Sequence, residues 1–228
     1  MPNWAYSKVT LSGTHSTVSL IKNRLATSYP SPHDPSRVEK GVFLLWNIIK
    51  PDNLDTYLEK DNKAFTEIVK ADPDLVELDK AVMPEPTMES IVAEVMSNLA
   101  TGQGWYEWNC RNWGTKWEIT DRAVLEYELP SFIPSEPTAH DNREQACLEL
   151  GYRMESAWSP PVEALDSLAE QYPEITITLS SIDESDCFAM EAQWDRGGRV
   201  FDTDVEITHD LGMDLRGYCN LECCNDYE

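Results

Sequence analysis

Alternating polar and apolar residues near the start of the chain predict a β-strand followed by a helix. The alternation covers residues 5–12 and stops at Gly13, as is typical of a strand that enters a turn. Apolar residues then recur at helical spacing as far as Leu25, with Ser16 as the predicted helix cap. After a polar loop, the apolar run 42–49 predicts a buried strand.

The middle of the chain combines a helical pattern, an aromatic motif and an extended pattern. Residues 53–102 carry apolar side chains at helical spacing, which predicts a helical insertion. Residues 104–117 contain five aromatic side chains. We interpret them as core packing rather than as a platform for nucleobases, because the surrounding sequence is acidic. A strand is predicted over 118–129, and the prolines of 130–137 predict a loop.

The last third of the chain has the clearest pattern. A strand is predicted over 150–158, a helix from Pro160 through Ala169, and a β-branched strand over 175–179. Two alternating runs, 187–194 and 199–208, then flank Gly197 and Gly198. Two glycines between alternating runs are typical of a β-hairpin.

The order of these elements predicts an α+β fold. A ferredoxin-like split βαβ antiparallel sheet accounts for it, with the helical insertion at 53–102 and an extra C-terminal hairpin. We expect one domain over residues 1–228, ending in an acidic, cysteine-containing tail at 209–228. The positions expected within the sheet are Val9, Ile177, Met190 and Val205.

Three motifs resemble the YubB-type ferredoxin-like family of plasmid and phage accessory proteins. They are MPNW at 1–4, NCRNWGTKW at 109–117 and AWSPP at 157–161. The chain departs from the family where Ala5 and Tyr6 replace a usual cysteine and its neighbour. The resemblance implies a ferredoxin-like fold and a setting in a mobile element of a bacterium. It implies no catalytic residue, because the family is one of unknown function.

The charge of the chain is strongly negative and unevenly distributed. The formal net charge is -23 at pH 7. Residues 1–117 contain 15 acidic and 12 basic residues, whereas residues 118–228 contain 26 and 6. No lysine follows Lys116. Because such a surface repels nucleic acid and anionic membranes, we expect neither as a direct partner.

We therefore predict an acidic ridge that binds a basic host protein, a nucleic-acid-binding defence effector of the restriction or CRISPR type. Carboxylates would stand in the place of DNA phosphates, so the protein would be a DNA mimic and an inhibitor. Two alternatives remain: a surface that is acidic only for solubility, and an interaction module that binds a peptide or a second copy through a sheet edge. The predicted ridge consists of Asp183, Glu184, Asp186, Asp202, Asp204 and Glu206.

The sequence contains little that indicates catalysis, a cofactor or a metal. Phosphate-binding, nucleophile-elbow and zinc-protease motifs are lacking, and the four histidines are scattered. The series Asp202-x-Asp204-x-Glu206 lacks the glycine and terminal glutamate of a calcium loop. We expect reduced cysteines, including the group Cys219, Cys223 and Cys224, and no bound metal. From the lack of catalytic motifs we expect a protein that is not an enzyme. Because the sequence has no signal-peptide pattern and no long apolar segment, we expect it in the cytoplasm.

Overall fold

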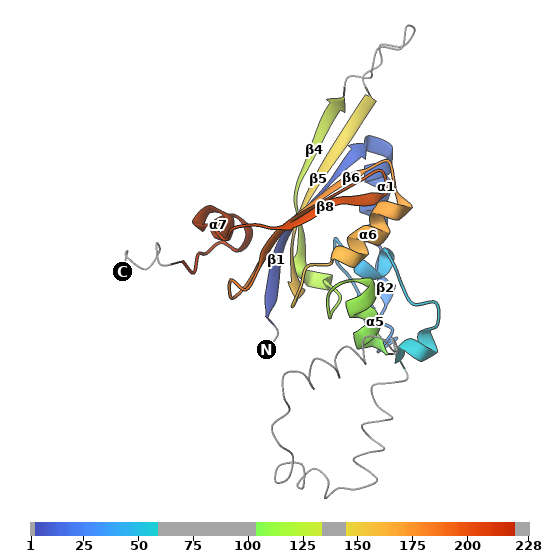
Figure 1. Ribbon diagram of the computed structural model, residues 1–228. Coiled ribbons are helices and arrows are strands. Elements are labelled where there is room, and N and C mark those ends of the chain that lie inside the picture. Colours follow the sequence, from blue (N-terminus) through green and yellow to red (C-terminus); the bar gives the residue numbers. More distant parts are fainter. Residues whose placement is uncertain (1–2, 59–103, 134–144, 222–228) are drawn as a thin grey trace, which may run out of the picture.

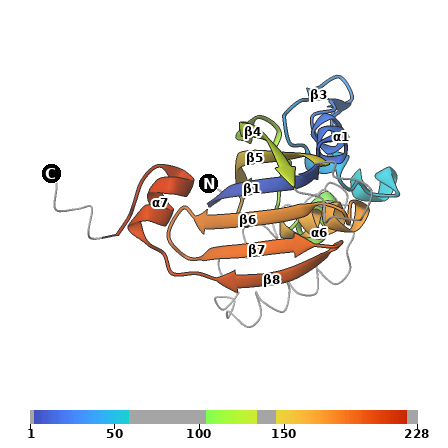
Figure 2. The ribbon, with the colours of Figure 1, turned by 90° about the horizontal axis from the view of Figure 1, so that it is seen from above.

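The computed structural model describes residues 3–58, 104–133 and 145–221. Within them, six strands form one antiparallel sheet in the order β4-β5-β1-β6-β7-β8 (Figures 1 and 2). Short strands β2 and β3 form a separate pair. The elements are β1 (Trp4–Thr14), α1 (His15–Leu25), β2 (Tyr29–Pro30), β3 (Val38–Glu39), the 3₁₀ helix η1 (Leu45–Asn47), α5 (Trp105–Asn112), the 3₁₀ helix η2 (Thr120–Arg122), β4 (Ala123–Ile133), β5 (Gln145–Ala157), α6 (Val162–Gln171), β6 (Thr176–Asp183), β7 (Ala189–Asp195), β8 (Gly198–Asp204) and α7 (His209–Arg216).

The connectivity of four strands and two helices confirms the predicted ferredoxin-like fold. The chain passes from β1 through α1 to β4 and returns as β5 between β4 and β1. It then passes through α6 to β6, on the other side of β1. This is the split βαβ arrangement. The hairpin β7–β8 extends the sheet beyond β6, with the predicted glycines at its turn.

One face of the sheet packs against α1 and α6, which lie on the same side (Figure 1). Alternation along the strands places Val9 and Leu11 on this face, and both are fully buried. Ile21 of α1 and Leu168 of α6 close the core over them. Trp194, also fully buried, extends this core onto β7. The buried face explains why the alternating pattern located these strands correctly.

The opposite face carries a smaller apolar cluster beneath α7. Ile182 of β6 contacts Leu215 of α7 there, with Leu211 beside them. Part of the predicted C-terminal tail, residues 209–216, is therefore a packed helix. The predicted second strand of the hairpin is also shorter than expected, because β8 ends at Asp204. Val205 lies just beyond it and still donates its backbone N–H to a neighbouring strand, at 2.9 Å.

The predicted strand over 42–49 is wrong. Most of its apolar side chains are buried as expected, but the backbone forms the 3₁₀ helix η1. The backbone N–H groups of Leu45 and Trp46 are bound by the carboxylate of Glu118, at 2.7 and 2.8 Å. A distant side chain thus satisfies the donors that a neighbouring strand would otherwise take.

The strand predicted over 118–129 is displaced along the chain. It begins at Ala123, after η2, and continues to Ile133 through part of the stretch predicted as a loop. Pro130 pairs with Leu148 of β5. Proline is tolerated there because, within the described part of the chain, β4 is an edge strand paired with β5 alone.

The aromatic motif 104–117 forms α5 and the turn that follows it. Gly114 has a φ of +80°, and a Cβ there would meet the Glu163 side chain, so this turn requires glycine. Trp113 is buried in the core as predicted. Residues 54–58 are helical, while residues 59–102 of the predicted insertion 53–102 lie outside the described residues.

Candidate functional site

Asp183, the first residue of the predicted acidic ridge, is 1% exposed. One carboxylate oxygen accepts hydrogen bonds from the backbone N–H groups of Ser185 and Cys187, at 2.8 and 3.1 Å. The other accepts from the Asn3 amide at 2.6 Å. The carboxylate therefore shapes the turn between β6 and β7 and does not lie on the surface, which corrects its place in the ridge.

Two neighbouring carboxylates in this turn also have partners inside the protein. Asp186 forms an ion pair of 2.6 Å with Arg216, whose side chain is fully buried. The same guanidinium donates to the carbonyl oxygens of Asp183 and Tyr218, at 2.6 and 3.1 Å. Glu184 accepts a hydrogen bond of 3.0 Å from the backbone of Trp4. The turn thus connects the start of β1 and the end of α7.

The other half of the predicted ridge is exposed. Every residue of β8 is exposed, and its outer edge has no partner strand among the described residues. Asp202 and Asp204 lie on β8, whereas Glu206 lies beyond its end. Asp202 forms an i,i+3 ion pair with Arg199 at 2.5 Å. Met190 pairs with Asp204, so the end of β8 adjoins the β6–β7 turn, as predicted.

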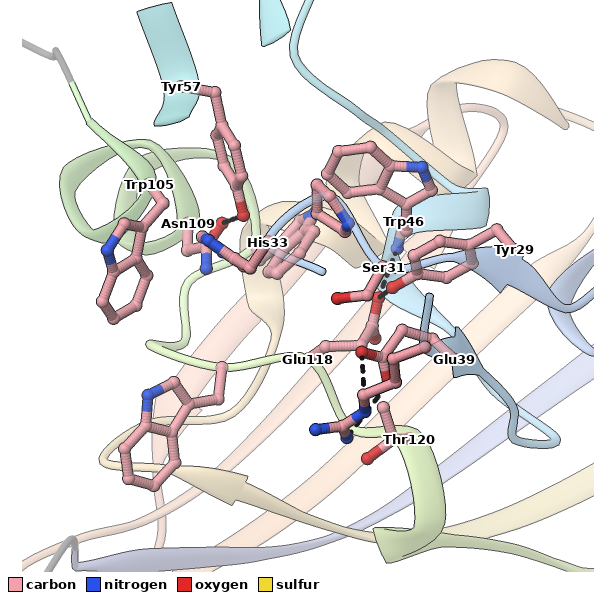
Figure 3. Close-up of a pocket in the computed structure, with 14 residues that line it drawn as sticks. Tyr29, Ser31, His33, Glu39, Trp46, Tyr57, Trp105, Asn109, Glu118 and Thr120 are labelled. Atoms are coloured by element: carbon pink, nitrogen blue, oxygen red, sulfur yellow. Dashed lines mark hydrogen bonds and ion pairs between the residues drawn. The ribbon is translucent and has the colours of Figure 1, made fainter. Parts of the chain in front are cut away.

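A second candidate site, which the sequence did not predict, is a cavity of about 460 Å³ between β2, η1, α5 and the segment before η2. Figure 3 shows Trp105 on one side and Tyr29 with Trp46 on the other, with Glu118 between them. The polar residues at its wall include His33, Arg37, Glu39 and Glu118. The aromatic residues lining it are Tyr29, Trp46, Tyr57, Trp105, Trp113 and Trp117.

Glu118 is a half-buried carboxylate in the wall of this cavity. Its Oε1 accepts from the backbone N–H groups of Leu45 and Ile119, at 2.7 and 3.0 Å. Its Oε2 accepts from the N–H of Trp46 and the hydroxyl of Tyr29, both at 2.8 Å. Removal from water raises the pKa of Glu118, and these four donors oppose that shift. Burial and the adjacent carboxylate together raise the pKa of Tyr29.

Local patterns could locate only half of this cavity. Trp105 and Trp117 belong to the aromatic motif, which was interpreted as core, and Trp117 is in fact 38% exposed. Tyr29 and Trp46 come from a segment more than 50 residues away in the chain. The density of aromatic residues before Glu118 was the available signal. No local pattern in the sequence relates Glu118 to Tyr29.

The described residues provide little for a metal or for thiol chemistry. Among them, no group of three His, Cys, Asp or Glu side chains is arranged to hold a metal ion. Cys110, Cys147 and Cys187 are free thiols, and the two cysteines at 223–224 lie outside this part of the chain. Over the same described ranges, no helix has both the length and the hydrophobicity to cross a bilayer.

Comparison with known proteins gives two similarities. Residues 138–211 match a family model described as a ferredoxin-like domain in Api92-like protein. Their described part contains the strands β5 to β8, with α6 and the start of α7. The chain also aligns with the crystal structure of a protein api92 from Yersinia pseudotuberculosis, at 10% identity and a TM-score of 0.37 over 91% of this chain and 99% of that one. Comparison with curated proteins finds no match.

Proposed function

We propose that this protein is a non-catalytic accessory protein of a phage or plasmid that binds a basic host protein through the edge of β8. The setting rests on the motif resemblance to YubB-type proteins, while the similarity of residues 138–211 to a ferredoxin-like domain supports the fold alone. The observation that carries the proposal is the exposed acidic edge: Asp202, Asp204 and, just beyond, Glu206. We place its action in the cytoplasm of the bacterial host, where a defence nuclease would be the target.

Spacing along the strand supports mimicry of nucleic acid. Alternate residues of a strand lie on one face about 6.6 Å apart, twice the rise per residue. Successive phosphates of a DNA strand have a comparable spacing, so Asp202 and Asp204 suit a groove lined with arginine and lysine. The ion pair between Arg199 and Asp202 lies at the surface, where such pairs contribute about 0–1 kcal/mol. A basic partner can therefore displace it.

A second candidate function is pairing through the sheet edge without mimicry. Besides its carboxylates, β8 exposes Val200 and Phe201, at 56% and 44%. A partner strand could pair with the backbone edge and cover these side chains. The partner would be a peptide or a second copy of the chain, which would make a homo-oligomer.

Inhibition of purified restriction and CRISPR nucleases tests the proposal. The triple substitution D202N/D204N/E206Q preserves side-chain size, and three lost surface contacts should weaken inhibition by roughly tenfold or more. The matched control D52N/D55N/E170Q changes three exposed acids outside β8 and should inhibit like the wild type. Inhibition by the wild type should also fall with added salt and with competing duplex DNA.

The same experiment distinguishes the two candidate functions. Two readouts are compared: inhibition of the nuclease, and dimer formation measured by light scattering. Edge pairing would be favoured if either readout is unchanged by salt and by the triple substitution but is lost in V200T/F201T. Absence of inhibition by the wild type across these nucleases would contradict mimicry of their DNA substrate.

A further inference from the structure

Contacts between aromatic rings hold the walls of the second candidate site, the aromatic cavity, in place. Tyr29 stacks on Trp46, with ring centroids 5.4 Å apart and planes 15° apart. Trp46 in turn meets the edge of Tyr57 at 5.7 Å. On the facing side, His33 contacts Trp105 at 5.8 Å (Figure 3). Rings fixed in this way form a cavity before any ligand arrives, so binding costs little ordering of side chains.

The charge in the cavity wall is negative, but its acceptor positions are largely occupied. All four hydrogen bonds described for the Glu118 carboxylate come from the protein itself. Glu39 lies against Arg37, whose side chain is 66% exposed and extends toward solvent. Asn109 accepts from the Tyr57 hydroxyl at 3.1 Å. The two carboxylates of the wall are therefore already bound within the protein, so they attract a cation by their charge rather than by new hydrogen bonds.

An adjacent group of rings already holds an ammonium group. The Nζ of Lys116 lies 4.4 Å from the ring centroid of Trp158 and 5.1 Å from that of Trp117. The ring of Tyr106 is 5.4 Å away. Trp117 also lines the cavity, and the lining described for the cavity includes no lysine. Trp117 therefore belongs both to a group of rings that holds a cation and to the lining of the cavity.

We propose that this cavity binds a methylated ammonium group, the cationic head of a small organic molecule. Electron-rich ring faces attract such a group. A quaternary ammonium has no N–H and therefore gives up no hydrogen bonds to water when it enters. The carboxylates of the wall, whose acceptor positions are occupied, then have nothing to replace. A primary ammonium loses its hydrogen bonds to water on entering and finds few substitutes. An anion would be repelled by Glu118. The cavity volume of about 460 Å³ lies within the range of small-molecule sites.

Titration of the full-length protein with choline tests the proposal. The uncharged isostere 3,3-dimethylbutan-1-ol has the same shape as choline, and ethanolamine has a primary ammonium instead. We expect choline to bind about tenfold more tightly than either compound. Adenosine is included because a planar base could also stack on the rings. Isothermal titration calorimetry gives all four affinities under one condition.

Substitutions locate the binding. W105L and W117L remove aromatic faces from the cavity and should each weaken choline binding about fivefold or more. E39Q removes one negative charge at the wall and should weaken it about twofold. The matched controls F201L and E170Q change an exposed aromatic residue and an exposed glutamate outside the cavity and should bind choline like the wild type. Thermal unfolding of every variant confirms that the variants compared are folded.

Several results would overturn the proposal. Equal affinities for choline and 3,3-dimethylbutan-1-ol would show that the cavity recognises apolar shape and not charge. Tighter binding of ethanolamine than of choline would show that the cavity has acceptors available for the N–H groups of a primary ammonium. Tighter binding of adenosine would make the cavity a nucleobase site. No binding of choline, or binding unchanged in folded W105L and W117L, would remove the cavity as a cation site. None of these results depends on the function proposed for β8.

Discussion

The β6–β7 turn and strand β8 have similar acidic sequences, but their carboxylates have different surroundings. In the turn, Asp183 is buried and binds backbone N–H groups, and Asp186 is paired with the buried Arg216. On β8, Asp204 is exposed. Both regions were expected to contribute to one acidic ridge. The exposed carboxylates are those of β8 and of Glu206 beyond it, whereas Glu184 and Asp186 are half-buried.

This difference shows that negative charge in a sequence is not the same as negative charge on a surface. A carboxylate near free backbone N–H groups stabilises a turn, and its charge is then shared with those donors. A carboxylate on an edge strand has solvent as its main partner. The turn should therefore respond to substitution through stability, and β8 should respond through binding.

The largest expected effect is on stability, from D183N. An asparagine keeps the shape of Asp183, but its amide group can no longer accept from Ser185, Cys187 and Asn3 together. Loss of charged hydrogen bonds and an unsatisfied buried donor should lower the free energy of unfolding by about 2–4 kcal/mol. Urea denaturation measures this value. A loss below about 0.5 kcal/mol would show that the turn does not depend on the carboxylate.

A smaller effect should appear at alkaline pH through Tyr6, which packs beside α7. Burial, above all, raises the pKa of Tyr6 from 10.0 to about 12, with contributions from Tyr218 and from the negative charges of Glu155 and Glu184. The folded state therefore holds the phenolic proton more tightly than the unfolded state. This contribution to stability is complete below pH 10 and is lost as the pH rises from 10 to 12.

The variant Y6F checks the alkaline prediction. It should lose less unfolding free energy than the wild type between pH 10 and pH 12, because only the wild type has this group to ionise. Tyr29 and Tyr152, whose pKa values burial also raises, are present in both proteins and serve as a common background. Identical pH profiles would show that Tyr6 does not contribute to the alkaline loss.

The smallest expected effect on stability is that of D204N. Its exposed side chain should change the unfolding free energy by no more than about 0.5 kcal/mol in either direction. The same urea denaturation measures it beside D183N, with the identical chemical change in both variants. A loss equal to that of D183N would mean that β8 uses its carboxylates structurally, and the contrast between the two regions would disappear.

Local patterns were sufficient for the central strands of the sheet and for its hairpin turn. Alternation identified β1, β6 and β7 because one face of each strand is buried, and Gly197-Gly198 located the hairpin turn. The prolines before α6 marked its start. The same reasoning was wrong at 42–49, where burial was predicted correctly but the backbone conformation depends on Glu118, some 70 residues away.

The periodicity and turn residues in the sequence determined strands β1, β6 and β7, the helix α6 and the fold class, since these follow from spacing along a short stretch of chain. Only the tertiary structure decided which acids are exposed and which aromatic residues line a cavity. Asp183 and Asp204 are chemically identical in the sequence, and Tyr29 is far from Glu118. Burial and hydrogen bonding depend on which distant groups the fold brings within a few ångströms, and local spacing contains no record of that.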